Sequence, residues 1–232
     1  MYCIYIVMDT LSFLQNTPLG KSLSETQMEI LAKSATEKKY RAGQFIVGDG
    51  HEIRDFYMVV KGTVKMSKSS HDGKEQTLCL LGPGQLFGMC AVFSDCLFPA
   101  NAMTLEKSTL LLVPDTVLKD LAREDPTILF NMLSILSDRL KEAMLLIESL
   151  SLMEVPKRVA YFLLFSNLKN TCSEGAIAKL AISQRELSKI LGTTPETISR
   201  VLKKLVEENI IRVRGRSIRI INCEALEELA TG

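Results

Sequence analysis

Apolar residues recur every three or four positions in two short stretches near the C-terminus, with a glycine between the stretches. Ser183 opens the first stretch with a capping box, and Gly192 ends it. Thr194 and Pro195 are residue types that begin a second helix. Two capped amphipathic helices joined by a short turn predict a helix-turn-helix over residues 183–207.

The polar face of the second predicted helix carries side chains that suit the major groove of DNA. Four of them share this face because their spacing follows the helical repeat: Glu196, Ser199, Arg200 and Lys203. An arginine can donate two hydrogen bonds to guanine, and a glutamate can accept one from cytosine. The alternative is a solvated charged face on an ordinary helix pair.

Residues 210–221 alternate apolar and basic side chains around Gly215, which predicts a β-hairpin. The polar side of this hairpin is all arginine: Arg212, Arg214, Arg216 and Arg219. Arginines beside a recognition helix can bind phosphates without reading sequence. A helix-turn-helix followed by a basic hairpin predicts a winged helix.

The N-terminal half follows a different pattern. Ser24 and Gln27 form a capping box that predicts a short first helix. From Tyr40 to Pro114 the chain consists of short β-rich runs separated by glycines. The runs are 44–47, 55–60, 63–67, 76–81 and 108–113. Strands of this length and spacing predict a small barrel or roll.

A long helix is predicted from about residue 125 to residue 150. Its apolar residues repeat in heptads: Leu133, Leu136, Leu140, Ala143, Ile147 and Leu150. We interpret this stripe as a dimer seam; the alternative is a helix packed on its own barrel. Pro156 can open the next helix but cannot continue this one, so residues 154–156 form a candidate hinge.

Composition and charge are consistent with a separate DNA-binding part at the C-terminus. The chain has 232 residues and a formal net charge of +1. From Glu154 onward the chain has 13 Lys and Arg and 9 acidic residues, whereas residues 1–153 have 15 Lys and Arg and 18 acidic residues. The basic excess therefore falls in the predicted winged helix. We expect a sensor domain over 1–124, a dimerisation helix and hinge over 125–153, and a DNA-binding domain over 154–232.

Enzyme chemistry, metal binding and membrane insertion find no support in the sequence. The chain has only two His, with no catalytic triad order, phosphate-binding glycine loop or metal-ligand cluster. The six Cys form no Cys-x-x-Cys pair, which favours reduced, mostly buried thiols. Residues 2–7 are apolar but too few for a signal peptide or a membrane span. We expect a cytoplasmic protein without catalytic activity.

Two segments identify a resemblance to a known family. GPGQLFGMCAVF at 82–93 is similar to the roll segment, and ETISR at 196–200 to the recognition helix, of the cyclic-AMP-receptor/fumarate-nitrate-regulator (Crp/Fnr) family. The resemblance covers roughly residues 10–225. It implies an α+β fold: an N-terminal cyclic-nucleotide-binding-like double-stranded β-roll, a long dimerisation helix and a C-terminal winged helix-turn-helix. It also implies a bacterial, effector-responsive transcription regulator that binds DNA as a homodimer, with RNA polymerase as a partner if it activates.

The resemblance assigns roles on DNA residue by residue. Glu196, Ser199 and Arg200 would contact bases. Phosphate contacts are expected from Ser183, Gln184, Thr194, Thr197, Lys203, Arg212, Arg214 and Arg216. Ser199 and Pro195 make the recognition helix more similar to the fumarate-nitrate-regulator branch. The expected target is an inverted repeat with TTGA- or TGTGA-like half-sites.

The family's known ligands do not match this chain. Where the family binds a cyclic nucleotide through Gly-Glu, Arg-Ser/Thr and a polar pair on the long helix, this chain has Gly88-Met89, Pro99-Ala100 and Ala143-Met144. A phosphate buried against these apolar residues would stay unpaired. Cyclic AMP and cyclic GMP are therefore disfavoured. An iron–sulfur cluster is disfavoured too, because it needs four cysteines and only Cys3 lies near the N-terminus.

The resemblance leaves an apolar effector pocket between the roll and the long helix. Its expected lining is Phe87, Met89, Leu97, Phe98, Ala143 and Met144. Such a pocket could hold haem, as in relatives that sense nitric oxide or carbon monoxide in nitrosative or redox stress. It could also be filled core or bind an unknown apolar ligand. His51 and His71 are candidate axial ligands that we interpret as exposed loop residues, and Cys90 and Cys96 are redox candidates that we interpret as buried thiols.

A second class of function remains open from the sequence. The roll and long helix could form a ligand-binding regulatory module that does not act through DNA. The basic wing argues against this module. DNA affinity that does not vary with salt would favour it.

Overall fold

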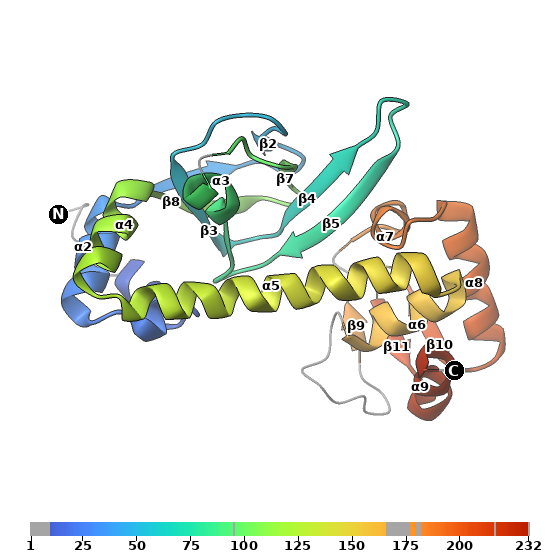
Figure 1. Cartoon of the computed structure of the whole chain (residues 1–232). Helices are drawn as coiled ribbons and strands as arrows, with labels where there is room; N and C mark the ends of the chain where they lie inside the picture. The colour runs from blue at the N-terminus through green and yellow to red at the C-terminus, as the bar shows by residue number, and fades with distance from the viewer. Residues whose placement is uncertain (1–9, 95, 166–176, 180–181, 216, 232) are drawn as a thin grey trace. The chain divides into compact units, whose positions relative to one another are not determined.

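The computed structural model describes the chain except residues 1–9, 95, 166–176, 180–181, 216 and 232. The expectations for residues 2–7, for Cys3 and for Arg216 therefore lie outside the described residues. The chain divides into two compact units (Figure 1). The first comprises residues 1–74 and 78–142, and the second comprises residues 75–77 and 143–232.

The first unit is built on two four-stranded sheets. One has the order β1 (Thr36–Tyr40), β8 (Ser108–Pro114), β3 (Asp55–Lys61) and β6 (Leu86–Phe87). The other has the order β2 (Phe45–Val47), β7 (Asn101–Thr104), β4 (Val64–Ser69) and β5 (Glu75–Leu81). The described pairings of β1 with β8, β3 with β8 and β4 with β7 are antiparallel. These sheets form the roll that the glycine-punctuated β pattern predicts.

Strand β3 is buried on both faces. Its side chains point alternately to the two faces, which explains how the first unit forms two apolar clusters. Phe56 and Met58 belong to one cluster, whereas Tyr57 and Val59 belong to the other. Successive side chains of a strand point to opposite faces of the sheet, so one strand serves two cores. The cluster around Tyr57 fills the roll, and the cluster around Phe56 joins the roll to helices.

The helices of the first unit cover the Phe56 cluster. A 3-10 turn, η1 (Gly20–Ser22), precedes α2 (Glu25–Ser34), and Ser24 and Gln27 make the predicted reciprocal capping box. The sequence pattern missed α3 (Met89–Ser94) and α4 (Asp115–Glu124). The long helix α5 spans Thr127–Leu152, and its first turns pack into this cluster.

The second unit contains the end of α5 followed by a winged helix-turn-helix (Figure 1). Its helices are α6 (Val155–Phe165), α7 (Gln184–Ile190), α8 (Pro195–Glu207) and α9 (Cys223–Thr231). A three-stranded antiparallel sheet has the order β10 (Ile211–Arg214), β11 (Ser217–Ile220) and β9 (Ile177–Lys179). As predicted, Pro156 lies in the first turn of α6, directly after α5 ends.

The cysteines depart from the expectation of reduced, buried thiols. Cys79 is free and half-buried, whereas Cys90 and Cys96 are free but exposed. Cys90 is exposed on α3 because Met89, Ala91 and Val92 form the buried face of that helix, and Cys96 lies after the helix ends. Cys223 is disulfide-bonded. The expectation of a reduced thiol is therefore wrong for Cys223.

Candidate nucleic-acid interface and effector pocket

The helix-turn-helix begins each helix with a side-chain cap. Ser183 Oγ accepts the backbone N–H of Glu186 at 3.2 Å, and Thr194 Oγ1 accepts that of Thr197 at 3.3 Å. Gly192 adopts the left-handed region, with φ of 60°, in the turn between the helices. Local sequence signals thus determine where both helices start and how the chain turns between them.

The predicted recognition helix α8 is amphipathic in the structure. Ile198, Leu202 and Leu205 are buried against the rest of the second unit. Glu196, Ser199, Arg200 and Lys203 are exposed and follow the opposite face. The structure therefore brings the three predicted base-contact residues together on one accessible surface. Gln184, Ser183 and Thr194 are exposed near the helix starts, and Thr197 is half-buried.

A chain of hydrogen bonds orders the exposed end of α8. Thr194 Oγ1 lies 3.2 Å from Thr197 Oγ1, which in turn accepts Arg200 Nη2 at 3.3 Å. The pKa of Glu196 is lowered by its own backbone N–H, by the Thr194 hydroxyl and by the charge of Arg200. Glu196 is therefore an ionised acceptor beside a guanidinium donor, and such a pair can discriminate a C·G base pair.

The wing presents its arginines opposite one another. In the β10–β11 register, Arg212 pairs with Arg219 and Val213 pairs with Ile218. Arg212, Arg214 and Arg219 are exposed, whereas Ile218 is buried. Like charges directly across a strand pair repel each other, so this arrangement favours a bound anion. A phosphate backbone supplies one.

Most of the predicted seam of α5 is exposed. Leu133, Leu140 and Ile147 are 59%, 62% and 64% exposed, and Ala143 is exposed as well. Leu136 packs against the Phe56 cluster, and Leu150 is half-buried. Four further large apolar side chains of α5 are exposed although the heptad pattern did not include them: Phe130, Met144, Leu145 and Leu152. An apolar surface of this extent on a helix is typical of an interface.

The residues predicted to line an effector pocket belong to different clusters and units of the fold. Phe87 stacks on Tyr57 with 4.8 Å between ring centroids, and Phe98 lies 6.2 Å from Phe87, all within the roll cluster. Met89 belongs to the other apolar cluster. Leu97 is 53% exposed, and Ala143 and Met144 lie in the second unit.

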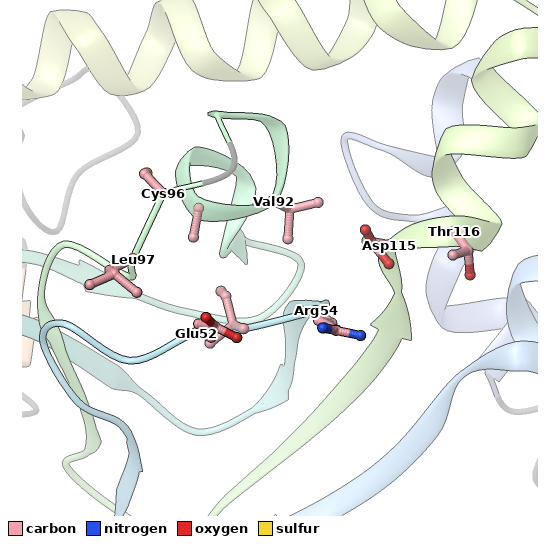
Figure 2. Close-up of a pocket in the computed structure, with 9 residues that line it drawn as sticks. Glu52, Arg54, Val92, Cys96, Leu97, Asp115 and Thr116 are labelled. Carbon is pink, nitrogen blue, oxygen red and sulfur yellow. The ribbon is translucent and has the colours of Figure 1, made fainter.

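The first unit contains a cavity of about 570 Å³ that the sequence did not reveal (Figure 2). Apolar and charged side chains line it together: Glu52, Ile53, Arg54, Ala91, Val92, Cys96, Leu97, Asp115 and Thr116. A hydrogen bond from Lys119 Nζ at 2.8 Å holds the pKa of Asp115 below its usual value. The lining comes from three segments distant in sequence, so only the tertiary fold assembles it.

The residues present do not fit a cyclic nucleotide. At the positions that would bind its phosphate and ribose, Met89 and Ala100 are buried apolar residues and Pro99 offers no hydrogen-bond donor.

His51 and His71 are exposed outside helices and strands, as predicted. Within the described residues, no group of three or more His, Cys, Asp and Glu could hold a metal ion. No helix of the described residues is long and apolar enough to cross a membrane.

Comparison with known proteins agrees with both halves of this fold. Residues 37–125 match the cyclic nucleotide-binding domain family, and residues 157–229 match the Crp-like helix-turn-helix domain family. A roll of the first family joined to a DNA-binding domain of the second defines a class of transcription regulators.

Relatives cover nearly the whole chain. The "Cyclic AMP receptor protein" of Thermus thermophilus is 31% identical over 94% of this chain and 99% of its own length. The "Fumarate and nitrate reduction regulatory protein" of Vibrio cholerae is 30% identical over 90% of this chain and 84% of its own. The solved structure of FixK2 from Bradyrhizobium japonicum has a TM-score of 0.77 at 28% identity, over 85% of this chain and 98% of that one.

The chain belongs to the Crp/Fnr family and is a DNA-binding transcription regulator of that type. The family and fold class expected from the sequence are confirmed.

Proposed function

We propose that this protein binds an inverted repeat as a homodimer and that an effector other than a cyclic nucleotide controls the binding. One observation carries the proposal. Glu196, Ser199 and Arg200 form an exposed face on α8, directly over a buried apolar stripe. Recognition helices of this type enter the major groove with such a face toward the bases.

The homodimer follows from α5 and from the geometry of DNA. Its exposed leucines and isoleucine need a partner surface, and a second copy of the same helix supplies a self-complementary one. A two-fold pair of α5 helices would also place two recognition helices on half-sites about one helical turn apart. The expected half-sites are TTGA- or TGTGA-like, and RNA polymerase is a partner if the protein activates. The site of action is the cytoplasm.

Replacing the arginine that is assigned to a base tests the proposal. Arg200→Ala should cost about 1–3 kcal/mol per half-site and relax discrimination at one base pair. Fluorescence anisotropy with duplexes of both half-site types measures this loss. Lys204→Ala is the matched control, because Lys204 is exposed on α8 outside the assigned contact set. Undiminished specific binding by Arg200→Ala would disprove the base-contact assignment.

The salt dependence of DNA affinity separates this proposal from a module that does not act through DNA. Arg212, Arg214 and Lys203 should each release counterions on binding, so that log affinity falls linearly with log salt. A flat response between low and physiological salt would favour the alternative module.

An absorption spectrum with added haem and nitric oxide tests haem as the effector. We expect no Soret band, because Phe87 and Phe98 already fill the roll and both histidines lie in exposed positions. A Soret band that shifts with nitric oxide would instead identify a haem-based sensor of nitrosative or redox stress.

A further inference from the structure

Three backbone carbonyls of the second unit converge on the guanidinium of Arg158, in the first turn of α6. Its Nε donates to the Met153 carbonyl at 2.8 Å, and its Nη2 donates to the Leu150 carbonyl at 3.0 Å. Its Nη1 donates to the Leu191 carbonyl at 2.8 Å. Leu150 lies in the last turn of α5, Met153 in the link to α6, and Leu191 at the C-cap of α7. One side chain therefore joins the end of α5 to the helix-turn-helix.

Arginine suits this position for two physical reasons. The last carbonyls of a helix have no partner within the helix, and a cation beside them is also favoured by the helix dipole. Arg158 meets this condition at the ends of two helices at once. Its N–H groups form a rigid fork, so all three acceptors are satisfied only while the segments keep one relative placement.

A second contact at this junction is independent of Arg158. Gly192, in the turn between α7 and α8, lies against the last turn of α5. A Cβ added at Gly192 would lie 2.7 Å from Cδ2 of Leu150. A side chain at position 192 would therefore require the Leu150 side chain to move.

We propose that Arg158 is a positioning residue for DNA binding. It fixes the orientation of α7 and α8 on the end of α5, and in a dimer it thereby fixes the separation and rotation of the two recognition helices. The inference rests on the proposed homodimer. Arg158 does not read bases, since three of its N–H groups are engaged with backbone carbonyls. Its loss should therefore change the tolerance for half-site spacing and leave the affinity for a single half-site unchanged.

The test compares wild-type protein with Arg158→Met on a series of duplexes. The half-sites stand at the preferred separation, or one or two base pairs closer or further apart, and a further duplex carries one half-site. Wild-type affinity should fall at least about tenfold when the spacing changes, because rigid linkage gives a high effective concentration at one geometry only. For Arg158→Met the spacing series should be flat to within about threefold, with affinity lost at the preferred spacing. Single-site affinity and salt slope should equal those of the wild type.

Arg123→Met is the charge-matched control, because Arg123 is an exposed residue of α4 in the other unit. Arg158→Lys, which offers a point charge on a flexible stem, should give an intermediate spacing preference. It also replaces Arg158→Met if the methionine variant does not fold. A spacing preference as steep as that of the wild type in Arg158→Met, or in Arg158→Lys where it replaces the methionine variant, would overturn the inference. Failure of wild-type protein to bind any inverted repeat would instead overturn the proposed function.

A measurement without DNA tests the inference independently of the proposed function. Spin labels on non-cysteine side chains at positions 148 of α5 and 204 of α8 report the distance between these helices in the full chain. The distance distribution should be narrow in wild-type protein and in Arg123→Met, and markedly broader in Arg158→Met. An unchanged distribution would overturn the role of Arg158 in positioning the helix-turn-helix.

Discussion

At the scale of single residues, the N-cap of α8 affects both the helix and its contact surface. Thr194 accepts the N–H of Thr197, and the Thr197 hydroxyl accepts a hydrogen bond from Arg200. The cap is thus linked to the guanidinium that we assign to a base. A change at Thr194 should therefore alter stability first and base recognition second.

Thr194→Ala should lower the free energy of unfolding by about 1 kcal/mol, because one of the first N–H groups of α8 loses its acceptor. Urea unfolding followed by circular dichroism measures the change. Thr194→Ser keeps a hydroxyl acceptor and is the matched control. An alanine variant as stable as the wild type would show that Thr194 does not stabilise the helix.

Asp115, at the start of α4, should make stability depend on pH. Its pKa is lowered from 3.8, first by the hydrogen bond from Lys119, so the folded protein binds the proton less readily than the unfolded chain. The stabilisation is fully present above pH 3.8 and is lost as the pH falls through the lower folded-state pKa.

Asp115→Asn should therefore destabilise the protein by about 0.5–1 kcal/mol near neutral pH, and this difference should vanish in acid. Melting temperatures of both proteins between pH 2 and 6 measure it. Asp120→Asn is the control, because its ion pair with Arg123 is 64% and 76% exposed and should contribute less. Parallel curves for wild type and Asp115→Asn over the whole range would contradict the assignment.

At the scale of elements, α5 combines two different faces. Ile128 and Met132 are buried in the first unit, whereas Leu133 and Leu140 are more than half exposed. The burial on one side holds the helix in place, so its other side is available for a partner. Because its buried and exposed apolar residues are different, α5 can pack into the core of the first unit and also form the proposed dimer seam.

Leu140→Glu should convert the proposed dimer to a monomer of 25.8 kDa in sedimentation velocity. A carboxylate buried in the seam would lose its hydration without gaining a partner, at a cost of several kcal/mol. Ser134→Glu introduces the same charge at an exposed position outside the stripe and should leave the dimer intact. A Leu140→Glu protein that remains dimeric would place the interface elsewhere.

The sequence predicted those elements whose signals are local. Capping residues and periodicity identified α2, α7 and α8, and the alternating arginines identified the β10–β11 hairpin. Helix α4 was missed because Pro114 at its N-cap provides no side-chain cap, so burial of Leu118 and Leu121 stabilises it instead. The proposed base-contact face could likewise be predicted from the periodicity of α8 alone, whereas the cavity at Arg54 and Asp115 needs the folded roll.

At the scale of the whole molecule, the roll unit and the DNA-binding unit are connected through one helix, α5. The division between the two units falls within α5, at residues 142 and 143. A ligand of the first unit can change DNA affinity only if it binds one arrangement of α5 and its neighbours more tightly than another. The chemistry of the roll therefore decides which signals can reach α8.

Cyclic AMP should neither bind this protein nor change its DNA affinity. A ligand at about 100 times its Kd stabilises a folded protein by about 2.7 kcal/mol, so thermal melting detects binding even without a DNA readout. Met89 and Ala100 are 4% and 1% exposed and offer the phosphate and ribose no polar side chain, and Pro99 carries no hydrogen-bond donor. We therefore expect no rise in melting temperature with millimolar cyclic AMP or cyclic GMP, and no change in anisotropy on the inverted repeat. The cyclic AMP receptor protein of Thermus thermophilus, measured in parallel, is the positive control. A saturable rise in melting temperature would mean that other groups of the roll hold the phosphate, and the exclusion would be wrong.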